Sequence, residues 1–164
     1  MKITFEQTQK AQKSLALARK KIKFETIELP ISKIVDFYLK PGYQYLDLKQ
    51  KQWSKTKQER YIETLLLGYP TAPLYLAHKN VADLHERRLI IDGAQRINAL
   101  ANFMTNKWAL DSNLTKLKAF AGFYLKDLPF MEKERFADQS LRIIVLIEPA
   151  AEICKDLYQR LNMV

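Results

Sequence analysis

The sequence is poor in cysteine, and it lacks any long apolar segment. Its single cysteine, Cys154, excludes an internal disulfide among the 164 residues. No apolar run approaches the roughly 20 residues that a membrane-spanning helix needs. The first residues also lack the apolar core of a signal peptide. Together these absences predict a cytoplasmic protein without a membrane partner.

The sequence also lacks the patterns of several common active sites. The two histidines, His78 and His85, fall in one expected loop with no thiol pair nearby, and Cys154 lies on an apolar helix stripe, so we predict no metal site. Serine and cysteine nucleophile signatures are missing, and no two carboxylates are paired by spacing alone. A His-Asn-His constellation is absent, so we expect no nuclease activity in this chain alone. No repeat, low-complexity segment or linker divides residues 1–164, which predicts a single domain.

What the sequence does have is an uneven positive charge. Residues 1–60 hold 14 Lys and Arg against 6 Asp and Glu, a net +8, whereas residues 61–164 hold 13 against 12, a net +1. Such asymmetry favours a polyanionic partner, and DNA bound by this basic N-terminal third is the usual case. The alternative is that these charges bind no partner and form a lysine-rich helix face that keeps the protein in solution. The basic N-terminal helix is expected within residues 1–23.

Helical and strand patterns are mixed along the chain, and 48% hydrophobic with 27% charged residues is typical of a globular protein. The periodicity predicts an α+β (mixed α/β) fold, with a small mixed sheet and flanking helices. A Thr56–Glu59 capping box and Gly68 would begin and end one of the helices. The expected helices cover 6–22, 31–39, 56–67, 95–105, 129–137 and a last segment after Pro149, and the expected strands cover 24–29, 73–77, 89–92 and 141–147, with a loop at 40–53.

The most informative segment is the strand-to-helix junction Asp92-Gly93-Ala94-Gln95-Arg96. Free N–H groups at a helix N-terminus suit an anion, and a glycine there permits close approach of a ligand. Arg96 could bind the same anion with a planar fork or form a plain salt bridge. Asp92 could orient Arg96, hold nucleotide-bound Mg²⁺ or cap the helix. The junction therefore predicts a phosphate site.

Five short motifs occur in a recognisable order. They are Tyr43-Gln44, Trp53, the segment 62–70 (IETLLLGYP), the segment 91–96 (IDGAQR) and the segment 158–162 (YQRLN). In this order they resemble the DGQQR-type N-terminal domain of GmrSD-like restriction and phage-defence proteins, in the ParB/sulfiredoxin-like superfamily. The resemblance covers about residues 27–162.

The resemblance implies binding and hydrolysis of a nucleoside triphosphate with Mg²⁺, in a domain that regulates cleavage of modified foreign DNA. Nuclease chemistry in such systems belongs to a C-terminal HNH domain or a partner chain. The implied catalytic residues are Asp92, Gln95 and Glu63, although Glu63 could equally be a solvent-facing helix charge. The implied nucleotide-binding residues are Gly93, Ala94, Arg96, Gln44 and Tyr43.

Two departures from the family pattern weaken the case for turnover. Ala94 replaces a glutamine of the central motif, and Tyr45 replaces an arginine of the Tyr-Gln-Arg element. Nucleotide binding needs neither side chain, whereas hydrolysis would lose two polar groups.

The sequence leaves three hypotheses for the function. The chain could be a nucleotide-binding regulatory domain with or without NTPase activity, a DNA-binding module with a degenerate nucleotide pocket, or an interaction domain whose N-terminal helix pairs with a partner or a second copy. We also expect a fragment or truncated copy, because the sequence stops just after the Arg-Leu-Asn element.

Overall fold

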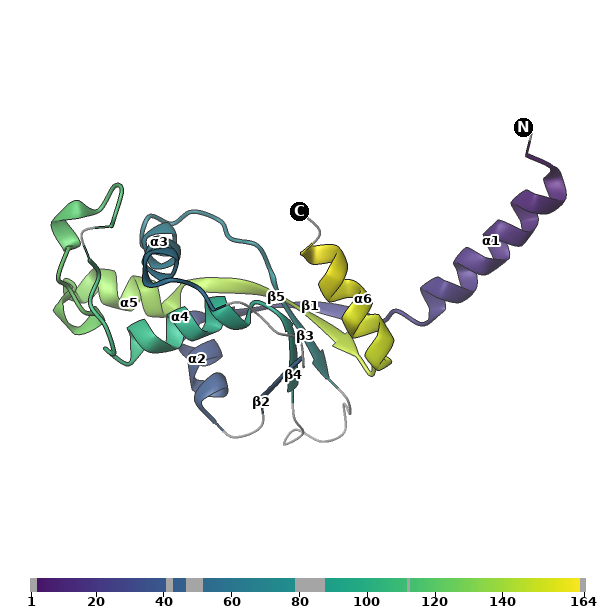
Figure 1. Cartoon of the computed structure of the whole chain (residues 1–164). Coiled ribbons are helices and arrows are strands. Elements are labelled where there is room, and N and C mark those ends of the chain that lie inside the picture. The colour runs from purple at the N-terminus through teal and green to yellow at the C-terminus, as the bar shows by residue number, and fades with distance from the viewer. Residues whose placement is uncertain (1–2, 41–42, 47–51, 79–87, 112, 163–164) are drawn as a thin grey trace.

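The computed structural model describes residues 3–40, 43–46, 52–78, 88–111 and 113–162. Its described elements alternate irregularly between helices and strands (Figure 1). In chain order they are α1 (Phe5–Lys20), β1 (Phe24–Pro30), α2 (Ile31–Leu39), β2 (Tyr43–Tyr45), α3 (Lys55–Leu66), β3 (Leu74–His78), β4 (Arg88–Asp92), α4 (Ala94–Met104), the 3₁₀ turns η1 (Lys118–Phe120) and η2 (Leu125–Asp127), α5 (Phe130–Asp138), β5 (Ser140–Ile147) and α6 (Ala151–Leu161).

The strands form one five-stranded mixed sheet in the order β1-β5-β3-β4-β2. β5 pairs antiparallel with β1 and parallel with β3, while β4 pairs antiparallel with β3 and parallel with β2. This arrangement confirms the predicted α+β class. The parallel pairs require crossover connections: α3 lies in the connection from β2 to β4, and α4 and α5 lie in the connection from β3 to β5.

Helices cover both faces of the sheet (Figure 1). Successive strand residues point to opposite faces, so Ile143 and Val145 join the core under α2 to α5, whereas Leu146 joins a second cluster under α6 with Ile91 and Cys154. A strand covered on both faces is apolar almost throughout, which explains why β5 has the clearest strand signal in the sequence.

The structure corrects two boundaries. Residues 40–53 were expected to be a loop, but Tyr43–Tyr45 pair with β4 as the edge strand β2. Three residues are too few for an alternating pattern, so only the pairing with β4 reveals this strand. The expected capping box at Thr56 and Glu59 is also wrong: Ser54 is the N-cap of α3, its Oγ accepts from the Lys57 N–H at 3.3 Å, and Glu59 is fully buried.

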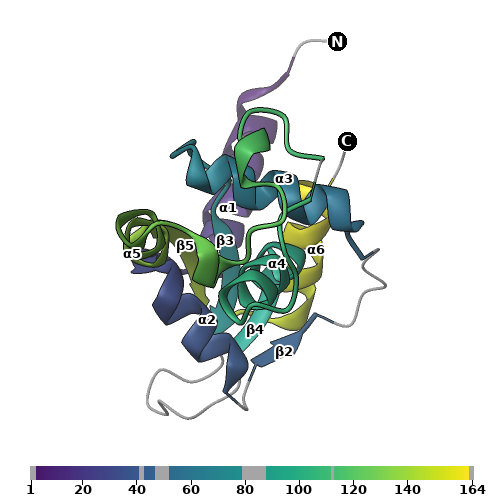
Figure 2. The same ribbon diagram turned by 90° about the vertical axis from the view of Figure 1, so that its left-hand side faces the viewer.

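Helix α1 stands apart from the other helices. In Figure 1 it extends away from the sheet on the side opposite α5, in Figure 2 it lies behind the sheet, and it buries no residue. The expected helix is thus present, but its apolar stripe packs against no described part of the chain. Within the described residues, no helix has the length and apolar character to cross a membrane.

Candidate functional site: the β4–α4 junction

The junction between β4 and α4 depends on Gly93. Its φ of +104° lies in the left-handed region, and a Cβ built there would be 2.4 Å from the Leu74 Cδ2 atom. Gly93 is also the N-cap of α4 and provides no side-chain cap. The alternative role of Asp92 as the helix cap is therefore wrong, because Asp92 is the last residue of β4. The first-turn N–H groups of α4 have no partners within the helix.

Arg96 turns inward from the first turn of α4 and is only 9% exposed. Its Nη2 donates to the Pro73 carbonyl at 3.0 Å and to the Asp92 Oδ2 atom at 2.7 Å, and its Nη1 donates to the Ala72 carbonyl. The guanidinium thus connects the start of β3 to the end of β4. This contact matches the proposed role of Asp92 in orienting Arg96. Burial raises the pKa of the nearby Tyr61 hydroxyl, and the positive charge of Arg96 partly opposes this increase.

A pocket of about 380 Å³ opens at the N-terminus of α4. It brings together five sequence-predicted residues, Asp92 to Arg96, with residues from two other elements. Those additional residues are Trp53, which lies just before α3, Lys57, in the first turn of α3, and Tyr158 and Asn162, at the end of α6.

Polar contacts hold one wall of this pocket. The Gln95 Oε1 atom accepts from the Trp53 N–H at 3.1 Å, which fixes the segment before α3 against α4. The Lys57 Nζ atom lies 4.7 Å from the centroid of the Trp53 ring, a cation–π distance. Since the Arg96 donors point to protein carbonyls and to Asp92, Lys57 is the pocket cation whose side chain is exposed.

Sequence reasoning did not select Lys57 as a site residue, because a lysine on a helix is usually solvated. The sequence pattern that could have identified Lys57 is its position four residues after Trp53, on the other side of the helix N-cap. Tyr158 and Asn162 belong to a motif that was noticed, but their position in the pocket comes from the packing of α6 against β4.

Glu63 lies away from this pocket, in a different polar site. Its buried carboxylate accepts the Thr115 N–H at 3.0 Å, the Thr115 hydroxyl at 3.1 Å, the Lys116 N–H at 2.7 Å and the Leu117 N–H at 2.9 Å. Burial acts to raise the pKa of Glu63, but the hydrogen bonds from Leu117, Thr115 and Lys116 outweigh it and lower the pKa. This carboxylate therefore holds the segment before η1 and is not solvent-facing.

Tyr43 and Gln44 are placed by their backbone only. β2 runs parallel to β4 with Gln44 opposite Leu89, three residues before Asp92. Their side chains are outside the described part of the structure, so their contribution to the pocket stays a prediction. Among the described residues, no three His, Cys, Asp or Glu side chains come together as a metal site.

The fold and junction define an α+β domain whose pocket lies where a strand leads into a helix. Residues 9–163 match the family model described as GmrSD restriction endonuclease, N-terminal domain, so the chain belongs to this family. The membership confirms the resemblance carried by the five motifs and implies a role in a restriction system. Neither a curated protein nor a solved structure matches the chain.

Proposed function

We propose that this domain binds a nucleoside triphosphate at the β4–α4 junction and thereby regulates a modification-dependent restriction system. The observation that carries the proposal is the uncapped N-terminus of α4, which opens into a pocket that also contains a lysine and two aromatic rings. Backbone N–H groups and the helix dipole favour phosphate oxygens there. Family membership supplies the restriction context.

The roles of the pocket residues follow from their contacts. The N–H groups of Ala94 and Gln95 and the ammonium of Lys57 would contact the phosphates. Arg96 would act mainly by positioning the junction, because its donors bind Asp92 and two carbonyls. Trp53 and Tyr158 are the aromatic residues that line the pocket, and they would contact the nucleobase.

Among the described residues, the pocket has too few oxygen ligands to bind Mg²⁺ by itself, so the ion would bind together with the nucleotide phosphates. Asp92 is the one acidic residue among the lining residues, and its Oδ2 atom already accepts from Arg96. The Asp92 carboxylate would hold Mg²⁺ together with the phosphates, and the ion would screen their charge. Of the three implied catalytic residues, Asp92 and Gln95 line the pocket, whereas the Glu63 carboxylate is engaged elsewhere. We propose binding as the primary activity.

The proposed function is tested by isothermal titration of the full chain with each of the four nucleoside triphosphates in the presence of Mg²⁺. We expect saturable binding of at least one. Absence of binding for all four, with the native circular dichroism spectrum retained, would overturn the proposal.

We expect Lys57→Met to weaken nucleotide binding about 10- to 100-fold. A hydrogen bond to a charged group contributes about 1.5–3 kcal/mol, and a tenfold change in affinity corresponds to about 1.4 kcal/mol. Lys57 is exposed and most of its aliphatic chain is retained in methionine, so the loss of its cation–π contact with Trp53 should lower stability by only about 0.5–1 kcal/mol. The measurement is the dissociation constant by titration.

Lys126→Met is the matched control for this change. Lys126 also lies over an aromatic ring, 5.3 Å from the Tyr124 centroid, but it does not line the pocket. The Lys126→Met variant should bind nucleotide with the same affinity as the wild type. Equal loss of affinity in both variants would contradict a specific phosphate contact at Lys57.

A second candidate function, DNA binding through α1, is favoured by a separate observation. α1 and the following turn expose six basic residues against Glu6 alone. We expect the affinity for duplex DNA to fall with salt, with a slope of log affinity against log salt of about −3 to −5. Lys10→Gln with Lys13→Gln should make that slope shallower by about 2, as measured by fluorescence anisotropy, whereas Lys133→Gln on α5 should not. A flat response to salt would contradict this function.

A further inference from the structure

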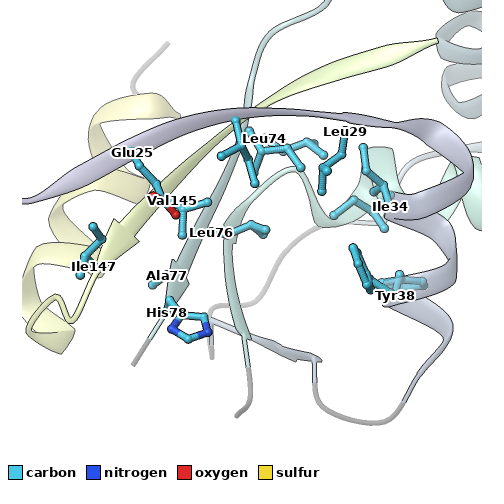
Figure 3. A pocket seen from close by; sticks show the side chains of 14 residues that line it. Glu25, Leu29, Ile34, Tyr38, Leu74, Leu76, Ala77, His78, Val145 and Ile147 are labelled. Atoms are coloured by element: carbon cyan, nitrogen blue, oxygen red, sulfur yellow. The ribbon is translucent and has the colours of Figure 1, made fainter. Parts of the chain in front are cut away.

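An apolar groove of about 230 Å³ lies on the α2 face of the sheet (Figure 3). Strands β1, β5 and β3 form its floor with side chains that include Ile27, Val145 and Leu76, and α2 forms one wall. Glu25 and His78 add polar groups at the end away from α2 (Figure 3). No described segment of the chain fills this groove.

The chain also contains an apolar helix surface that packs on nothing described. Ala11, Leu15, Ala18 and Ile22 recur at helical spacing on α1 and its continuation, and Leu15 and Ile22 are about half exposed. Isolated helices of this length are marginal in water, so α1 needs a packing surface for its stability. A Thr4 capping box starts the helix but does not replace such a surface.

The short connection between α1 and β1 disfavours a return of the helix to the groove of its own chain. The Ile22 N–H donates to the Arg19 carbonyl at 3.1 Å, which continues the helical geometry up to Ile22. The next residue, Lys23, already accepts from the Ile147 N–H at 2.9 Å and so belongs to the sheet. Only residues 21–23 separate the end of α1 from the start of β1, which is a short connection for a reversal of the chain. α1 therefore points away from its own sheet, as Figure 1 shows.

We propose that α1 of one copy binds in the groove of a second copy, so that two chains exchange their N-terminal helices. The exchange is reciprocal and closes with two-fold symmetry, because each copy offers one helix and one groove. Such an exchange of an identical element is a common route to a homodimer. The exchange also buries the apolar stripe of α1 and the apolar groove, which a single copy leaves uncovered.

Size and charge fit this occupant. α1 has 16 residues and is therefore about 24 Å long. The groove follows β5 from Ile143 to Ile147, which is about 13 Å, or between two and three helical turns. The small Ala11 and Ala18 side chains allow close approach to the sheet. Arg19, one turn after Leu15, can pair with Glu25 at the rim.

The basic residues on the opposite side of α1 remain exposed in this arrangement. Lys10, Lys13 and Lys20 lie about half a turn from the Leu15 stripe at 100° per residue. The exchange is thus compatible with binding of nucleic acid by the outer face of α1, and it does not depend on the nucleotide pocket.

The proposal is tested by size-exclusion chromatography with light scattering on the full chain over a range of concentrations. We expect a species with twice the 19.2 kDa mass of one chain. Leu15→Glu should shift it to the monomer. Leu17→Glu is the matched control, because Leu17 is an exposed leucine on the far side of α1 and its variant should remain dimeric. A wild type that is monomeric at every concentration would overturn the proposal.

A cysteine pair identifies the occupant of the groove. In the variant Leu15→Cys with Ile147→Cys, oxidation should link two chains, seen as a dimer band on a non-reducing gel, and neither single variant should give this band. A cross-link within one chain would show that α1 folds back on its own groove, which would contradict the exchange.

Discussion

Glu63→Gln is expected to lower the free energy of unfolding by about 2 to 4 kcal/mol. The carboxylate accepts four hydrogen bonds with two oxygens, three of them from backbone N–H groups. An amide has one oxygen, so its NH₂ group would face either the Thr115 N–H or the N–H groups of Lys116 and Leu117. A buried donor without a partner costs about 1–3 kcal/mol. Urea denaturation at neutral pH measures the loss.

The effect of Glu63 should depend on pH in a defined direction. Its pKa is lower in the folded chain than the ordinary value of 4.5. The unfolded chain therefore binds a proton more readily, and the stability from Glu63 is complete above the unfolded pKa and lost as the pH falls through the folded pKa. The difference between wild type and Glu63→Gln should shrink in this acid range.

Glu132→Gln provides the comparison for this prediction. Glu132 is a surface acid that pairs with Arg135 at 3.2 Å, and surface pairs contribute about 0–1 kcal/mol. Its replacement should change stability little at any pH. Equal, small effects of Glu63→Gln and Glu132→Gln would contradict the structural role of Glu63.

Gly93→Ala is expected to destabilise the chain by about 2 to 4 kcal/mol. The left-handed backbone at Gly93 costs a residue with a Cβ about 1–2 kcal/mol. The new methyl group would also overlap the buried Leu74 side chain, and overpacking of a core costs about 1–3 kcal/mol. Because Leu74 leads β3 next to the Arg96 contacts, nucleotide binding should weaken as well. Urea denaturation and nucleotide titration measure the two effects.

Gly68→Ala separates the two causes. Gly68 has a φ of +74°, but a Cβ there would meet no atom within 4 Å. Its replacement should cost only the backbone term of about 1–2 kcal/mol and leave binding unchanged. If both variants lost the same stability, the close approach of Gly93 to Leu74 would play no part.

Local patterns in the sequence predicted most of the fold. The alternation in β1, the apolar run of β5 and the stop at Gly68 depend on neighbouring residues, and each is found in the structure. β2 could not be predicted, because its three residues become a strand only by pairing with β4. The stripe of α1 was recognised, but the sequence could not show that its own chain leaves it exposed.

The candidate site was harder to predict than the fold. The motif around Gly93 identified the junction, because the glycine stands between a strand pattern and a helix pattern. The contact of Arg96 with Asp92 was predicted, because the two residues lie four apart. The other contacts of Arg96 and those of Glu63 could not be predicted, because their partners lie more than 20 and more than 50 residues away in sequence. The family resemblance suggested catalysis for Glu63, whereas its hydrogen bonds hold the segment before η1.

The inward orientation of Arg96 has a consequence for the interpretation of variants. Removal of its guanidinium would leave the Asp92 carboxylate and the carbonyls of Ala72 and Pro73 without their donor. An Arg96 variant that fails to bind would therefore be ambiguous, since the same substitution loosens the walls of the pocket. The Lys57 ammonium, in contrast, is exposed and lies over the Trp53 ring, a contact that contributes about 0.5–1 kcal/mol at an exposed site, so affinity can be varied at Lys57 with little change in folding.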